Sequence, residues 1–150
     1  MSETNRIADQ LRRAFAGDPW HGDPLSAILA GVTADQAQAR PLPKSHNIWE
    51  IVLHIELYTG LAIGAIQGIP MPRLYVEKKD WPPVTGEWAT ALEKLFATAE
   101  SLAQAIDAFP DTRLEDTVPG RDYNFYYLFH GIVQHSLYHG GQISLLKGNL

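Results

Sequence analysis

Two histidines spaced four residues apart near the C-terminus constrain the fold of this chain more than any other feature. His135 and His139 stand in the segment 128–146, whose apolar and histidine positions recur every three or four residues, the period of an α-helix. At this spacing both imidazoles lie on one helix face and are predicted to point toward the core. A lone core histidine is usually satisfied by a hydrogen bond, whereas two on one buried stripe favour a shared cation.

A third ligand is expected, because two imidazoles alone hold a divalent ion weakly. His130 precedes the pair by five residues and would lie on the opposite side of the helix. His21 and His46 fall in segments typical of a turn and of a helix start, which favours a solvated or capping role for each. His54 lies instead on an apolar stripe of the segment 47–67, so it is predicted to face the core from a second helix.

Three histidines without a fourth protein ligand indicate an open metal site, at which water or a substrate completes the coordination. The predicted ligands are His54, His135 and His139, which helices packed about 8 to 10 Å apart can bring to one ion. Structural zinc sites usually contain thiolates, and this chain has no cysteine. Ser136 stands where a metalloprotease helix carries its catalytic glutamate, so that mechanism lacks its general base here.

Three segments of the chain resemble the DinB-like superfamily, which includes YfiT-like metal-dependent hydrolases and thiol-dependent transferases. The segment 130–147 (HGIVQHSLYHGGQISLLK) resembles the signature of the last helix, 47–54 resembles the second helix, and 20–29 resembles the N-terminal segment. The resemblance implies a four-helix bundle with a divalent metal, often nickel or zinc, bound by three histidines that fall here on His54, His135 and His139. It does not single out a reaction, because members of the superfamily differ in activity.

The pattern of the whole chain predicts an all-α fold, a four-helix bundle in one domain over residues 1–150. The length of 150 residues is close to the commonest size of a single protein domain. Main helices are predicted near 1–15, 47–67, 87–109 and 128–146, with short extra helices after Asp23-Pro24 and after Thr33. The segment 68–86 holds four prolines and predicts a long connection between the second and third main helices, which either covers the site or carries the chain across the bundle.

Composition argues against nucleic-acid and membrane partners. The net charge is −5 and the twelve Lys and Arg residues are scattered, whereas phosphate binding needs a basic patch. No apolar run is expected to approach the ~20 residues that span a bilayer. The N-terminal segment is amphipathic without the apolar core of a signal peptide, and with the lack of cysteine this predicts a cytoplasmic protein.

The predicted helix 47–67 is apolar on two sides. Trp49, Val52 and Ile63 form its second apolar face, and only Glu50 and Glu56 carry charge. Either the N-terminal segments, with 25–32 foremost, cover this face, or a second subunit does. Because a two-fold pair is the commonest way to bury such a face, a homodimer is predicted.

Two tyrosines and one glutamate flank the predicted ligands. Tyr58 and Tyr138 fall beside the histidine stripes, where a phenol can donate to a water on the metal or to a developing anion, and both are predicted catalytic residues. Glu50 lies near His54 on the helix face, but its spacing from Asn47 also matches a capping box. Capping and support of the site are therefore both open for Glu50.

Three glycines interrupt the last helix. Gly131, Gly140 and Gly141 each cost about 1 kcal/mol relative to alanine in a helix interior. That cost predicts close backbone approach. For Gly131, a tolerated packing feature and room for a substrate above the metal are equally favoured.

These features together favour a metalloenzyme that acts on a small-molecule substrate. A divalent ion with a free position lowers the pKa of a bound water or binds a thiolate directly. Because the chain has no thiol, thiol chemistry would need a low-molecular-weight thiol as cosubstrate, and hydrolysis and thiol transfer both stay open. The alternative is a non-catalytic metal- or ligand-binding stress-response protein that uses the same residues.

Overall fold

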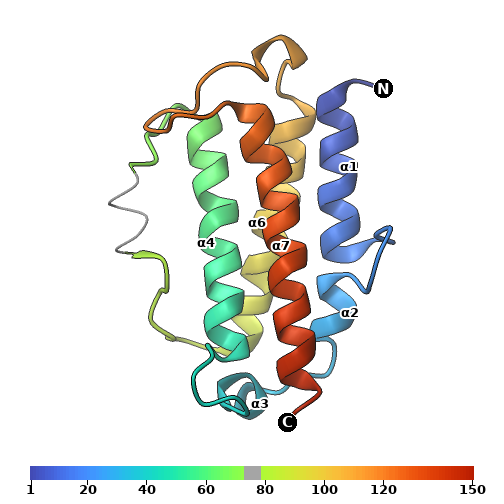
Figure 1. The fold of residues 1–150 in the computed structure, drawn as a ribbon, viewed down its shortest axis with the longest axis vertical. Helices are drawn as coiled ribbons and strands as arrows, with labels where there is room; N and C mark the ends of the chain where they lie inside the picture. The colour runs from blue at the N-terminus through green and yellow to red at the C-terminus, as the bar shows by residue number, and fades with distance from the viewer. Residues whose placement is uncertain (73–78) are drawn as a thin grey trace.

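The computed structural model describes residues 1–72 and 79–150, and four long helices packed side by side dominate them (Figure 1). The long helices are α1 (Glu3–Ala16), α4 (Ile48–Ile66), α6 (Trp88–Asp107) and α7 (Phe125–Lys147). The short ones are α2 (Leu25–Leu29), α3 (Ala34–Gln38) and the 3₁₀ turn η1 (Asp111–Arg113). The described residues contain no strand, only one isolated bridge between Thr117 and Asn124. The predicted all-α bundle is confirmed.

Neighbouring helices of the bundle run in two directions. In Figure 1 the chain descends in α1 and α7 and ascends in α4 and α6. Because α4 ends at the opposite end of the bundle from where α6 begins, the segment between them must return along the bundle's length. The long connection predicted over 68–86 therefore carries the chain from one end of the bundle to the other, and residues 73–78 of it lie outside the described part.

Polar side chains start most of the helices, as their sequence patterns predict. Thr33 with Gln36 and Asn47 with Glu50 form complete capping boxes, and the side chain of Asn124 accepts from the backbone of Tyr127. The predicted start of α2 is displaced by one residue. Pro24 is the N-cap, with no side-chain cap hydrogen bond, in place of Asp23, because the carbonyl of Pro24 accepts the first helical N–H groups.

The second long helix, α4, is a core element that packs against α6, α7 and α3. It is the one helix among residues 1–72 and 79–150 whose length and composition would also suffice to cross a membrane, contrary to the expectation that no run approaches that length. Half of its apolar window is buried inside the bundle. The apolarity of α4 is therefore explained by packing on both sides.

The second apolar face of α4 is covered largely within the chain. Trp49 and Val52 are buried, and the ring of Trp49 contacts that of Trp88 from α6 at a centroid distance of 5.3 Å. Ile63 is partly buried against the same core. Part of this cover comes from α6, and the indole of Trp88 in turn donates to the carbonyl of Val32, whose side chain is also buried. With these residues covered internally, the homodimer stays a prediction that needs another surface.

The glycines of α7 differ in what surrounds them. A Cβ atom on Gly140 would lie 3.4 Å from Cδ1 of Ile28 and 3.5 Å from Cδ2 of Leu25, so α2 does approach the backbone of α7 there. Among residues 1–72 and 79–150, no atom outside the helix would lie within 4 Å of a Cβ on Gly131 or Gly141. The close approach predicted for all three glycines is thus correct for Gly140 and wrong for the other two.

Alanine at Gly131 or Gly141 should stabilise the protein. Each substitution should raise the free energy of unfolding by up to about 1 kcal/mol, because alanine favours the helix and meets open space. Gly140→Ala is the matched comparison, since its Cβ would lie in van der Waals contact with Ile28 and not in open space. Chemical denaturation of the three variants measures the difference. Destabilisation by Gly131→Ala would show that space above this turn is needed by the fold.

Candidate metal centre

Two long helices bring the three predicted ligands together. His54 comes from the middle of α4, and His135 and His139 come from consecutive turns of α7. One ring nitrogen from each lies within 4.8 Å of the others. His54 and His139 are buried, with 5% and 6% of their surface exposed, and His135 is half-buried. Three imidazoles from different turns thus converge on one point inside the bundle.

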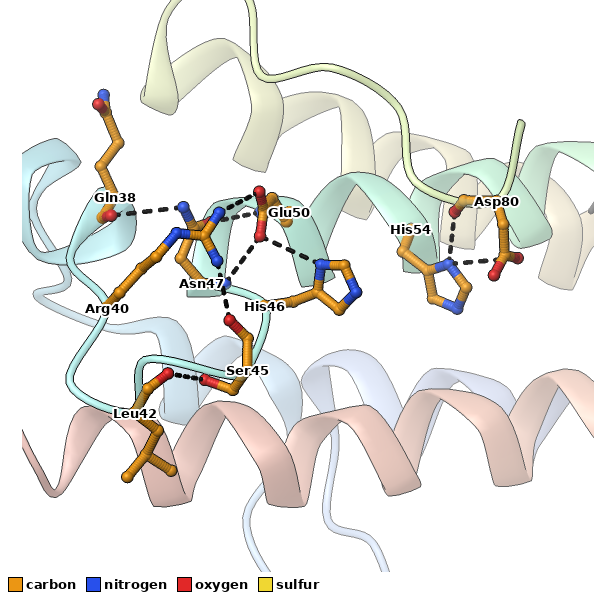
Figure 2. Close-up of polar contacts among 9 residues, drawn as sticks. All are labelled: Gln38, Arg40, Leu42, Ser45, His46, Asn47, Glu50, His54 and Asp80. Atoms are coloured by element: carbon orange, nitrogen blue, oxygen red, sulfur yellow. Dashed lines mark hydrogen bonds and ion pairs between the residues drawn. The ribbon is translucent and has the colours of Figure 1, made fainter. Parts of the chain in front are cut away.

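Hydrogen bonds fix the orientation of two of these rings. His54 Nδ1 lies 2.7 Å from the carbonyl oxygen of Asp80, so this nitrogen carries a proton and donates it (Figure 2). His139 Nδ1 lies 2.6 Å from the side-chain oxygen of Gln142 and donates in the same way. In a neutral imidazole the other nitrogen, Nε2, then holds a lone pair. Such a second hydrogen bond is the usual way in which proteins orient a metal-binding histidine.

The third ring, His135, lacks this kind of partner. Its Nδ1 is buried without a hydrogen bond to any described residue, and its Nε2 lies 2.9 Å from Nε2 of His54. Because His54 Nε2 holds a lone pair, a 2.9 Å contact requires a proton on His135 Nε2. In the absence of a cation, His135 is therefore held through this one contact with His54.

This donor set fits a divalent metal ion. Ligand distances of about 2.0 to 2.1 Å place neighbouring nitrogens of a tetrahedral site about 3.3 Å apart. The three ring nitrogens here lie within 4.8 Å of one another, so small movements of the rings would bring them to that separation. An ion would replace the proton between His135 and His54, and neutral imidazole is a favoured ligand of zinc and nickel. The three-histidine group is thus compatible with metal binding.

The long connection supplies two residues that the sequence did not single out. Asp80 accepts from His54 through its backbone carbonyl, and its carboxylate lies 3.7 Å from the same ring nitrogen. The indole of Trp81 stacks on His54 at a centroid distance of 4.2 Å and an interplanar angle of 11°. The only signal for these residues was the unusual length of the connection. Gln142 was visible as a member of the helical stripe, one turn after His139.

A charged network at the start of α4 supports Trp81 from its other side. The ring of His46 stacks on Trp81 at 3.4 Å, and His46 Nδ1 lies 3.2 Å from a carboxylate oxygen of Glu50 (Figure 2). Glu50 also receives hydrogen bonds from Arg40 and from the backbone N–H of Asn47. Burial raises the pKa of Glu50, but these hydrogen bonds outweigh burial and lower it. Glu50 therefore caps α4 and also holds His46, so it combines helix capping with support of the residues around the site.

The two predicted catalytic tyrosines occupy different environments. Tyr58 lies against His54 and His135, with ring centroids 4.9 and 4.8 Å away, and its hydroxyl donates to the carboxylate of Asp80 at 2.6 Å. Burial and this hydrogen bond raise the pKa of Tyr58. Tyr138 is 66% exposed, with its ring 5.1 Å from that of His139. Tyr58 thus holds the connection in place, and Tyr138 borders the site on the solvent side.

The remaining histidines lie apart from this centre. His130 packs against Tyr126 on α7 with its Nε2 buried and unpaired, and it is not a member of the converging group. His21 is exposed beside Trp20. His46 touches Trp81 and not the ligand nitrogens, so its role is indirect.

Burial lowers the pKa of two of the site histidines, His135 and His139. Burial, followed by the nearby His139 and His54, lowers the pKa of His135 from its ordinary 6.5 to about 3. The pKa of His139 is lowered mainly by burial, against the opposing hydrogen bond to Gln142. The spacing alone predicts proton competition near pH 6.5, the ordinary value. The structure moves that competition to lower pH for these two ligands.

The metal-free protein should lose stability in acid because of these lowered pKa values. Between pH 6.5 and about 3 the unfolded chain protonates His135 and the folded chain does not, so the free energy of unfolding falls as pH falls through this window. Urea denaturation of metal-free wild type and His135→Asn at pH 7 and pH 4.5 measures this. The wild type should lose more stability than the variant between the two pH values. Equal losses would contradict a buried neutral His135.

Comparison with known proteins agrees with this geometry. Neither the curated proteins nor the solved structures include a match to this chain. A model of the DinB superfamily matches residues 20–143, a range that contains α4, most of α7 and all three converging histidines. Because the match spans most of its length, the chain belongs to the DinB superfamily.

Proposed function

We propose that the protein binds one divalent metal ion through His54, His135 and His139, and uses it as a metalloenzyme on small molecules. Three imidazoles converge on one point, and a proton shared between two of them cannot satisfy all three. This convergence is the observation that carries the proposal. Zinc and nickel are the expected ions, because imidazole suits both. The reaction is hydrolysis by activated water or transfer of a low-molecular-weight thiol.

The chain's own residues would set up such a site before an ion arrives. Asp80 and Gln142 hold two of the rings in the tautomer that a ligand needs, which lowers the cost of ordering them. Trp81 covers the ring face of His54 and limits the access of water from that side. A bound divalent ion would supply Lewis acidity and favour the anionic form of a water or a thiol. With three protein ligands, one position is left for a substrate.

The carboxylate of Asp80 is the acidic group that contacts the site. It receives the Tyr58 hydroxyl at 2.6 Å and lies 3.7 Å from His54 Nδ1. These two contacts place the carboxylate of Asp80 where it would orient His54 and offset the positive charge of an ion. Tyr58 acts through Asp80 and is in this proposal a positioning residue, whereas Tyr138 remains beside the open side of the site.

Metal stoichiometry tests the first part of the proposal. Purified protein loaded with zinc or nickel should hold about one ion per chain, and His54→Ala, His135→Ala and His139→Ala should each lower the affinity at least tenfold, because two imidazoles bind weakly. Elemental analysis after dialysis and a titration against a competing chelator measure both quantities. His130→Ala is the matched control from the same helix.

Two outcomes would contradict the metal site. Loss of metal from His130→Ala together with full binding by His54→Ala would show that the ion sits on another face of α7. Unchanged affinity in all three variants would show that these histidines are core residues and nothing more.

A parallel screen tests catalysis. Metal-loaded protein is offered electrophilic acceptors with and without a low-molecular-weight thiol, and ester and amide substrates in the same buffers. Turnover that falls at least a hundredfold in His54→Ala supports the enzyme, since that variant loses the ion that lowers the barrier. Saturable binding of small molecules without turnover would support the alternative, a non-catalytic binding protein.

A further inference from the structure

A cavity of about 400 Å³ opens directly beside the three-histidine site. His139 and Trp81 form its inner wall, and the rest comes from the segment before α4, the first turn of α4 and the C-terminal half of α7. Ile51 and Leu146 are buried at its floor, whereas Leu145 is 59% exposed at its edge. This size is within the range of small-molecule sites in proteins.

Two residues in the wall of this cavity have donors free for a ligand. Among the described residues, Lys44 is the one permanently charged residue of the wall, and it makes no ion pair. The oxygen of Gln142 accepts from His139, so its N–H groups are the part left for a ligand. Ser45 already donates its hydroxyl proton to the carbonyl of Leu42, so it is not a free donor. No aspartate or glutamate among residues 1–72 and 79–150 lines the cavity.

The neighbouring charges also favour an anion of low charge. A helix start can bind a phosphate through its free N–H groups, but the start of α4 is already occupied by the carboxylate of Glu50. Arg40, the guanidinium nearest in sequence, is paired with that carboxylate. One lysine and one amide suit a single carboxylate better than a phosphate, which usually recruits arginines or a helix start.

We propose that this cavity is the substrate pocket of the histidine site and takes a small molecule with an apolar or aromatic body and a carboxylate, with Lys44 as the group that selects the carboxylate. The apolar floor binds the body, and Lys44 and Gln142 donate to the carboxylate. This inference rests on the proposed function, because it assigns a substrate class to the same site. It predicts that the pocket distinguishes small molecules by their charge through Lys44, which is not one of the three metal ligands.

Nuclear magnetic resonance titrations with three matched probes test the pocket. Phenylacetate, phenylacetamide and phenethylamine share one apolar body and differ in charge. Phenylacetate should shift the indole N–H of Trp81 and the side-chain amide of Gln142, and it should bind more tightly than the amide. Lys44→Gln should weaken the binding of phenylacetate roughly two- to fivefold, as expected for an exposed lysine, and should leave the affinity for phenylacetamide unchanged.

A lysine elsewhere provides the control. Lys94 on α6 pairs with Glu56, away from the cavity, so Lys94→Gln should not change the affinity for either phenylacetate or phenylacetamide. The proposal is overturned if phenethylamine binds as tightly as phenylacetate, if Lys44→Gln has no effect, or if the shifts gather at the separate cavity of about 480 Å³ between α1 and α6. Absence of binding by all three probes at millimolar concentration would also overturn it.

Running the titrations on metal-free and zinc-loaded protein separates this inference from the proposed function. If the chain takes up no zinc, the metal site fails, while charge discrimination in the metal-free protein still supports the pocket. If zinc binds with the expected stoichiometry and discrimination is absent in both forms, the pocket fails and the metal site stands.

Discussion

The contact between the imidazoles of His54 and His135 is the interaction on which the rest of the site depends. Two ring nitrogens 2.9 Å apart cannot both present lone pairs, so a proton or a cation must lie between them. Asp80 fixes the tautomer of His54 and thereby assigns the shared proton to His135, whose other nitrogen is buried without a partner among the described residues. A divalent ion would take the place of the shared proton and would accept a lone pair from each of the three rings, which a proton cannot do.

The surroundings of this contact are built from segments far apart in the chain. Arg40 and Asn47 hold Glu50, Glu50 holds His46, and His46 and His54 enclose Trp81 between them. The start of α4 and the long connection are thus joined through one stacked indole. Tyr58 closes the other side by holding Asp80. The connection is therefore part of the site, and the wall it forms with Trp81 is shared with the adjacent cavity.

Local patterns predicted the helices well, because they depend on neighbouring residues. The capping boxes at Thr33 and Asn47 and the spacing of His135 and His139 are short-range signals, and the structure contains each of them. The start of α2 was displaced by one residue because proline at a helix start fits both Ncap and N1, and only backbone hydrogen bonds decide between them.

Contacts across long sequence separations could not be read from the chain. Nothing local indicates that Asp80 and Trp81 reach back to His54, since no period links a loop to a helix. The glycines of α7 look alike in sequence, yet only Gly140 meets another helix, because that depends on where α2 packs. Cover of Trp49 by Trp88 likewise depends on packing, so the two-sided apolarity of α4 does not by itself distinguish a subunit interface from an internal contact.

The tautomers of the three histidines decide whether this group holds a metal ion. Long-range ¹H–¹⁵N spectra of the imidazoles distinguish Nδ1–H from Nε2–H rings, without and with one equivalent of zinc. We expect His54 and His139 to keep Nδ1–H in both states and His135 to change from Nε2–H to Nδ1–H when zinc binds. If His135 keeps its Nε2 proton in zinc-loaded protein, the three histidines do not hold the ion.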